Sequence, residues 1–141
     1  GDHGLWKKSV FYESSLRVPM VIAGQGVSNK SIQSEALVDL IDLAPTFLDI
    51  AGLDIPEDWG GKSLLKLMEN DIDYQHSKVQ ISILNDNYMV FDGRWKLISR
   101  DGERVLFDLL NDMAEEDNVA DKYPEIVEQL LTEYKREIQN G

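Results

Sequence analysis

The sequence contains no cysteine, which excludes disulfides, thiolate zinc sites and a cysteine nucleophile within these 141 residues. It also lacks an uninterrupted apolar run of the roughly 18 residues that would span a bilayer, so we expect no membrane partner. Basic residues are few, because 14 Lys and Arg stand against 26 Asp and Glu and leave a net charge of −12. An acidic surface repels phosphate backbones, which argues against nucleic acid as a partner.

An initiator methionine and a signal segment are absent as well. The chain opens on the polar run Gly1-Asp2-His3-Gly4, and we therefore expect it to begin inside a longer polypeptide. Periplasmic, secreted and lysosomal locations are all compatible with the sequence, which also leaves the oligomeric state open. The length suits a compact domain with its own hydrophobic core.

Residues 1–70 carry the pattern of an α/β domain. The apolar run over 17–24 is continuous rather than alternating, which predicts a short strand buried on both faces, as in a parallel sheet. Asp42 is the predicted N-cap of a helix with Pro45 in its first turn. Gly52 is placed to end that helix in the left-handed conformation.

Residues 71–141 change to an α+β pattern. Alternating or β-prone segments at 79–84, 87–91, 95–99 and 104–109 predict antiparallel strands, with turns at Asp92-Gly93 and Asp101-Gly102. A helix is predicted from Pro124 to about Gln139, because apolar residues repeat there at helical spacing. We therefore expect an α/β domain end over 1–70 and a subdomain over 71–141, with a small antiparallel sheet and a long C-terminal helix.

Four segments, in this order, resemble the sulfatase family. They are GDHGLWKKSVFYESSLRVPMVIAG at 1–24, DLAPTFLDIAG at 42–52, GKSLL at 61–65, and LFDL at 106–109 followed by Asp112, Glu115 and Asn118. The resemblance covers nearly the whole chain and implies the alkaline-phosphatase-like superfamily. It identifies residues 1–70 with the C-terminal part of the α/β catalytic domain and 71–141 with the C-terminal subdomain.

The resemblance implies part of a metal-dependent sulfuric ester hydrolase that acts on a small-molecule or glycan sulfate ester. It also implies a divalent metal, expected to be calcium, and a formylglycine in the full-length enzyme. The family's nucleophile motif, Cys- or Ser-x-Pro-x-Arg, has no match here, nor does its early aspartate pair. These 141 residues alone are therefore expected to be inactive and to bind no cofactor. Phosphonate or phosphate ester hydrolysis is an alternative, and so is a non-catalytic binding or oligomerisation module.

Lys8 is the predicted catalytic and substrate-binding residue. It occupies the family position of a substrate lysine, four residues before Tyr12-Glu13. Its ammonium would stabilise the negative charge that builds on the sulfuryl group in the transition state. Lys7 takes this position if the register slips by one. The alternative to a catalytic role is that both lysines are ordinary solvent-exposed side chains.

His3 is a second catalytic candidate, expected near the leaving group. Asp2 is an alternative metal ligand, but it stands only six residues before Lys8, whereas the family's late metal pair stands about a dozen before that lysine. We therefore expect no metal ligand in this chain and a metal pair upstream of Gly1.

The remaining candidates are expected to be structural or peripheral. We expect His76 to lie at the surface. The resemblance implies a C-terminal subdomain that borders the substrate cleft, so contact of a hairpin residue with the organic part of the substrate is the alternative to a structural role. Capping and loop hydrogen bonds are expected, rather than calcium binding, for the acidic segment after the last strand. The hairpin candidates are Asn85, Asp86, Asn87 and Arg94, and the acidic-segment candidates are Asp112, Glu115 and Asn118.

Overall fold

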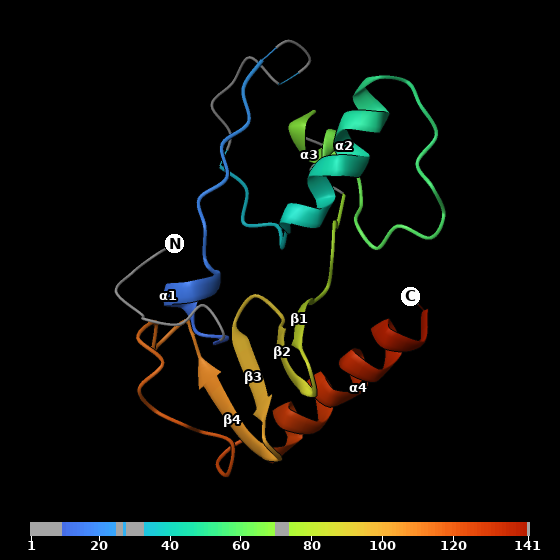
Figure 1. Cartoon of the computed structure of the whole chain (residues 1–141). Helices are drawn as coiled ribbons and strands as arrows, with labels where there is room; N and C mark the ends of the chain where they lie inside the picture. Colours follow the sequence, from blue (N-terminus) through green and yellow to red (C-terminus); the bar gives the residue numbers. More distant parts are fainter. Residues whose placement is uncertain (1–9, 25–26, 28–32, 70–73, 141) are drawn as a thin grey trace. The chain divides into compact units, whose positions relative to one another are not determined.

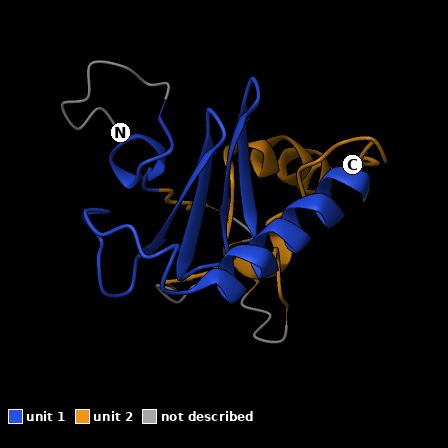
Figure 2. Ribbon diagram, turned by 90° about the horizontal axis from the view of Figure 1, so that it is seen from below, with its two compact units in different colours: residues 1–19, 79–140 blue, residues 20–78, 141 orange. Residues whose placement is uncertain are grey.

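The computed structural model describes residues 10–24, 27, 33–69 and 74–140 (Figure 1). The chain divides into two compact units, coloured in Figure 2. In the described chain, the first unit combines residues 10–19 with Val79–Asn140, and the second is Met20–Lys78. The family-level division into residues 1–70 and 71–141 stays a prediction.

The first unit contains a four-stranded antiparallel sheet, ordered β1-β2-β3-β4 (Figure 1). Its strands are β1 (Gln80–Leu84), β2 (Asn87–Phe91), β3 (Trp95–Arg100) and β4 (Glu103–Asp108). The turns use residues that tolerate positive φ, with Asn85 at 55°, Gly93 at 101° and Asp101 at 52°. The predicted strands are thus confirmed, with small shifts at their ends.

Helix α4 (Pro124–Asn140) covers one face of this sheet (Figure 1). The shared core is apolar and consists of Val90, Leu97, Leu106, Val127, Leu130 and Leu131. Tyr88 of β2 stacks on Tyr134 of α4 with ring centroids 4.0 Å apart. The predicted small antiparallel sheet with a long C-terminal helix is confirmed. No helix in the described ranges has the length and apolar character needed to cross a membrane.

The opposite face of the sheet packs against the segment that leads into α1 (Glu13–Leu16). Phe11, 6% exposed, joins an apolar cluster there with Met89, Ile98, Phe107 and Leu109. Side chains alternate along a strand, so Leu97 points toward α4 while Lys96 and Ile98 point toward α1. This segment is separated from the sheet by more than sixty residues of sequence.

The second unit contains η1 (Leu40–Asp42), α2 (Leu43–Ile50) and α3 (Leu65–Met68). Asp42 precedes α2 as predicted, but its side chain makes no capping bond to that helix. The helical stretch begins one turn earlier, at Asp39, whose side chain accepts from the Leu40 N–H. Asp42 thus holds the predicted N-cap position, but its carboxylate turns inward and makes no capping bond to α2.

Gly52 ends α2 as predicted, with φ at 69°. Its N–H donates to the Asp49 carbonyl and the Leu53 N–H to the Leu48 carbonyl, at 3.0 and 2.9 Å. These are the two bonds of a Schellman motif.

The strand predicted over 17–24 is not formed in the described residues. Val18 and Val21 are 44% and 90% exposed there. A strand needs a neighbour, and the one sheet in the described chain is the β1–β4 sheet, which does not include this segment.

Candidate functional site

The residues predicted to do chemistry lie outside the described chain. Asp2, His3, Lys7 and Lys8 all fall within residues 1–9. Their roles therefore stay predictions. The described chain begins at Val10, two residues after Lys8, and this is where a site can be built from structure.

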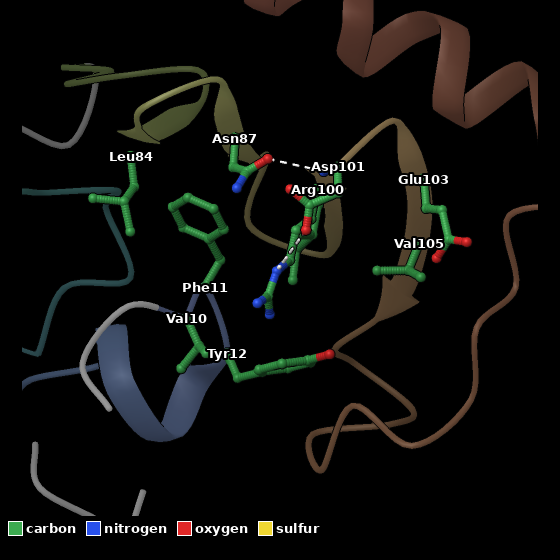
Figure 3. Close-up of a pocket in the computed structure, with 10 residues that line it drawn as sticks. Val10, Phe11, Tyr12, Leu84, Asn87, Arg100, Asp101, Glu103 and Val105 are labelled. Atoms are coloured by element: carbon green, nitrogen blue, oxygen red, sulfur yellow. Dashed lines mark hydrogen bonds and ion pairs between the residues drawn. The ribbon is translucent and has the colours of Figure 1, made fainter. Parts of the chain in front are cut away.

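Val10 lines a cavity of about 310 Å³ in the first unit (Figure 3). The segment 10–12 forms one wall, and the strand ends around two turns form the other. Among the described residues, the lining consists of Val10, Phe11, Tyr12, Leu84, Asn87, Ile98, Arg100, Asp101, Glu103 and Val105.

The sheet's topology explains why two turns meet here. In an antiparallel meander, the β1–β2 and β3–β4 turns lie at the same end of the sheet. The Asp101 N–H donates to Oδ1 of Asn87 at 2.9 Å and joins the two turns, as the dashed line in Figure 3 shows. Asn85 and Asp101 both adopt the left-handed conformation that such tight turns require.

The wall from residues 10–12 is held by burial. Phe11 is anchored in the apolar cluster on the sheet, while Tyr12 is 37% exposed. The Tyr12 ring lies 6.0 Å from the Phe107 ring, measured between centroids. The segment thus reaches the pocket with its backbone fixed by an apolar anchor on the sheet.

The pocket combines an apolar floor with a polar rim. Arg100 and Asp101 form an exposed ion pair at 3.5 Å, which contributes little to stability and leaves other guanidinium donors for a ligand. Asn87 adds an amide, and Tyr12 adds a hydroxyl. No Ser, Thr, His, Lys or Cys occurs among the described lining residues. The described part of the pocket can therefore bind a polar ligand but offers no side-chain nucleophile of these types.

A buried ion cluster follows directly after Tyr12 in the sequence. Lys96, wholly buried on β3, places its Nζ 2.5 Å from Oε1 of Glu13 and 2.8 Å from Oε1 of Glu115. The other oxygen of Glu115 accepts the Glu13 N–H at 2.6 Å. Lys96 was not among the sequence candidates, because a lysine in an alternating strand ordinarily lies on the solvent-exposed face.

Arg94, another hairpin candidate, lies in the β2–β3 turn at the opposite end of the sheet from Asn87. Its Nε and Nη2 donate to the two Asp108 oxygens at 2.9 and 2.7 Å. The Arg94 hydrogen bond is the main cause that lowers the pKa of Asp108 to about 2, helped by a bond from Asn111. The same bond raises the pKa of Arg94. Arg94 therefore belongs to a different surface from the pocket.

His76 was predicted at the surface, and this is wrong. It is 4% exposed, and its Nε2 lies 2.9 Å from Oδ2 of Asp42. A carboxylate can only accept, so Nε2 carries the proton, and in the neutral ring Nδ1 accepts from the Tyr74 hydroxyl at 3.3 Å. Asp42 also accepts the N–H groups of Asp39 and Lys62, both at 2.8 Å.

In the acidic segment after β4, Asp112 and Asn118 make loop hydrogen bonds as predicted, whereas Glu115 does not, because its carboxylate binds the Lys96 ammonium. Asp112 accepts the N–H groups of Glu116 and Asp117. Asn118 accepts the Leu106 and Ala120 N–H groups, each at 3.0 Å. Across the described ranges, no three His, Cys, Asp or Glu side chains gather as a metal site. The described residues thus do not fit the implied metal, and the expected ligands upstream of Gly1 stay a prediction.

Three comparisons with known proteins agree with one another. The sequence profile described as "N-sulphoglucosamine sulphohydrolase, C-terminal" matches residues 1–140. Human arylsulfatase K is 35% identical over 141 residues, which cover 89% of this chain and 26% of that protein. The chain thus spans about a quarter of the length of this curated relative.

Solved structures give the same result. A Bacteroides thetaiotaomicron protein assigned to the sulfatases matches with a TM-score of 0.79 and 26% identity, over 93% of this chain and 32% of that one. A second structure, in complex with its substrate D-glucosamine-2-N,6-O-disulfate, matches with a TM-score of 0.60 and 26% identity. It covers 70% of this chain and 23% of that one.

Proposed function

We propose, because this chain belongs to the sulfatase family as a C-terminal portion of it, that the whole protein hydrolyses sulfate esters with the help of Lys8. The solved sulfatases share the antiparallel sheet and C-terminal helix, so the predicted fold class is confirmed. The activity, substrate and cofactors of the whole protein are parts of the proposal.

The supporting observation is that Val10, two residues after Lys8, lines the pocket. Two residues of chain span about 7 Å at most. We therefore propose that the Lys8 side chain reaches a ligand in the pocket. Lys8 and the pocket form the reactive and the binding part of one proposed site.

The proposed role of Lys8 is electrostatic. As the ester bond breaks, negative charge grows on the sulfuryl oxygens, and a fixed ammonium stabilises this transition state more than the ground state. We propose that His3 lies near the leaving oxygen. We propose that residues beyond those described bind the divalent metal and carry the formylglycine. The metal would supply further positive charge, and the formylglycine would supply the nucleophile.

The proposed substrate is a sulfated amino sugar. This is supported by the description of the matching family and by the substrate bound in one structural neighbour. The cavity, about 310 Å³, lies at the lower end of the range of small-ligand pockets, which suits a single sugar ring. Asn87, Arg100 and Asp101 offer planar polar groups to its hydroxyls.

The test compares Lys8→Ala with Lys7→Ala in the whole protein, with sulfate release from D-glucosamine-2-N,6-O-disulfate as the measurement. Loss of an electrostatic donor should lower kcat/KM by about 10²–10³-fold in Lys8→Ala, and Lys7→Ala should stay near wild type. Near-normal kinetics of Lys8→Ala would overturn the assignment, and a loss confined to Lys7→Ala would move it by one residue.

The same assay separates the alternatives. A phosphate ester of the same sugar should be cleaved far more slowly than the sulfate ester. Faster cleavage of the phosphate ester would assign the protein to phosphate ester hydrolysis instead. Sugar binding without turnover by the whole wild-type protein would favour a non-catalytic binding module.

A further inference from the structure

The helical stretch formed by η1 and α2 reverses the usual arrangement of polar and apolar side chains. Asp42 and Thr46 are polar, yet they point inward and are only 5% and 3% exposed. A surface helix ordinarily buries its apolar stripe and turns its polar side to water. Here every exposed residue between positions 40 and 51 is apolar. This set, called the apolar face of α2 below, consists of Leu40, Ile41, Ala44, Phe47, Ile50 and Ala51.

The inward side of α2 is held by hydrogen bonds. The Thr46 hydroxyl donates to the Asp42 carbonyl and accepts the Leu64 N–H at 2.9 Å, which ties α2 to the start of α3 beside it (Figure 1). The Asp42 carboxylate accepts from two backbone N–H groups and from His76. The inward side is therefore already satisfied by polar contacts, and the apolar side chains of the helix are left to face outward.

Three large side chains dominate the apolar face of α2. Leu40, Phe47 and Ile50 are 58%, 66% and 54% exposed, and their helical spacing places them on one side of the stretch. Single exposed apolar residues are common on proteins, but a contiguous set of them marks an interaction surface. Removal of this surface from water would be favourable, so the face requires a partner with an apolar surface of its own.

A second segment of the same unit indicates the kind of partner. Val21 is 90% exposed and lies in the continuous apolar run over 17–24. Continuous runs are typical of strands in parallel sheets, and helices cover the faces of such sheets. The helix thus lacks a sheet face to cover, and in the described chain the run lacks a neighbouring strand. One parallel sheet would supply both.

The relatives are long enough to contain such a sheet outside the matched part. The chain covers 26% of human arylsulfatase K and 32% of the Bacteroides thetaiotaomicron structure, and the matching profile describes a C-terminal portion. A second copy of this chain is a less suitable partner, because each copy carries a net charge of −12 and like charges repel. A sheet in the same polypeptide has no such association cost, since it is present at a high effective concentration.

We propose that the apolar face of α2 packs on the face of a β-sheet formed by the part of the whole protein outside this chain. The face is then an internal packing surface, on which Phe47 is the central anchor. This packing is independent of the proposed hydrolysis of sulfate esters, and an inactive whole protein would still show it.

Hydroxyl-radical footprinting of the whole protein tests this directly, because the oxidation rate of a side chain follows its exposure to solvent. Phe47 and Phe107 form a matched pair of identical chemistry that are 66% and 4% exposed in the described chain. We expect Phe47 in the whole protein to be oxidised as slowly as Phe107. A Phe47 rate in the folded whole protein that equals its rate in urea would overturn the inference.

Dilution distinguishes the sheet from a second copy. Packing within one polypeptide does not depend on concentration, so the protection of Phe47 should persist over about a hundredfold dilution. Protection that disappears on dilution, together with a change from dimer to monomer by light scattering, would overturn the inference in favour of a second copy.

Substitutions test the energetic consequence in the whole protein. Phe47→Ala should raise the unfolding equilibrium constant by about 10²–10³-fold, because it empties a buried phenylalanine site. Ile138→Ala is the control on α4, where the side chain is 50% exposed, and it should change the constant by less than about threefold. Equal effects of the two variants would overturn the inference. If Phe47→Ala does not fold, Phe47→Leu should fold with a lowered urea midpoint, and an unchanged midpoint would overturn the inference as well.

Discussion

Asp42 in the second unit offers a sharp test of how buried hydrogen bonds hold this chain together. Its carboxylate accepts from the Asp39 N–H, the Lys62 N–H and His76 Nε2, and the residue is 5% exposed. Asp42→Ala removes all three acceptor contacts while leaving the donors in place. The donors then lose their acceptor, and for the buried His76 ring this costs more than replacing both partners by apolar groups would.

The expected loss follows from the kind of contact broken. Each of these N–H groups bonds a carboxylate, and a hydrogen bond to a charged group contributes about 1.5–3 kcal/mol, so Asp42→Ala removes a large share of the roughly 5–15 kcal/mol that stabilises an ordinary domain. Asp42→Asn keeps the shape and one acceptor oxygen but points an amide at the Asp39 N–H or the Lys62 N–H. We expect it to cost about 1–3 kcal/mol, the range for an unsatisfied buried group.

Hydrogen exchange is the appropriate assay, because the Asp39 and Lys62 amides are themselves the donors. Their protection should fall in proportion to the loss of local stability. Asp54→Asn is the matched control, since Asp54 is an exposed aspartate of the same unit and the charge change is identical. If the Asp39 and Lys62 amides exchange at the same rate in Asp42→Asn as in Asp54→Asn, the reasoning is refuted.

Two further predictions concern other parts of the chain. The pKa of Asp108 is depressed in the folded state, so its stabilising contribution is present above the ordinary pKa near 3.8 and lost as pH falls toward about 2. Asp108→Asn should therefore flatten the acid dependence of the urea midpoint between about pH 4 and 2, less so at high salt; an unchanged slope at low salt would contradict it. A Cβ at Gly61 would overlap the Ile41 carbonyl, whereas one at Gly60 meets nothing within 4 Å. Gly61→Ala should lower the free energy of unfolding in urea by about 1–3 kcal/mol and Gly60→Ala by nothing measurable, and equal free energies of unfolding for the two variants would disprove the crowding.

The parts of the fold that local patterns encode were predictable. Asp92-Gly93 and Asp101-Gly102 mark their turns because short-range sterics alone decide which residues accept positive φ. The helix beginning at Pro124 follows from its own apolar spacing. None of these needs information from a distant segment.

The buried polar clusters were not predictable for the opposite reason. Asp42 and His76 are 34 residues apart, and no local pattern pairs them. Lys96 stands in an alternating strand, where a lysine ordinarily indicates the solvent face. The strand predicted over 17–24 is likewise absent from the described structure. A strand forms only when a second segment pairs with it, and the sequence of one segment does not show whether that partner is present.

The connection of Glu13 to Lys96 also has a kinetic consequence. The four strands and α4 are joined by short turns and loops, so they can assemble from contacts that are close in sequence. The segment around Phe11 must instead close a loop of more than eighty residues before it finds the ammonium. During synthesis this segment leaves the ribosome before the sheet does, and it gains its partners only after Glu115 has emerged. The docking of the pocket wall onto a preformed sheet is thus expected to be the late step of folding.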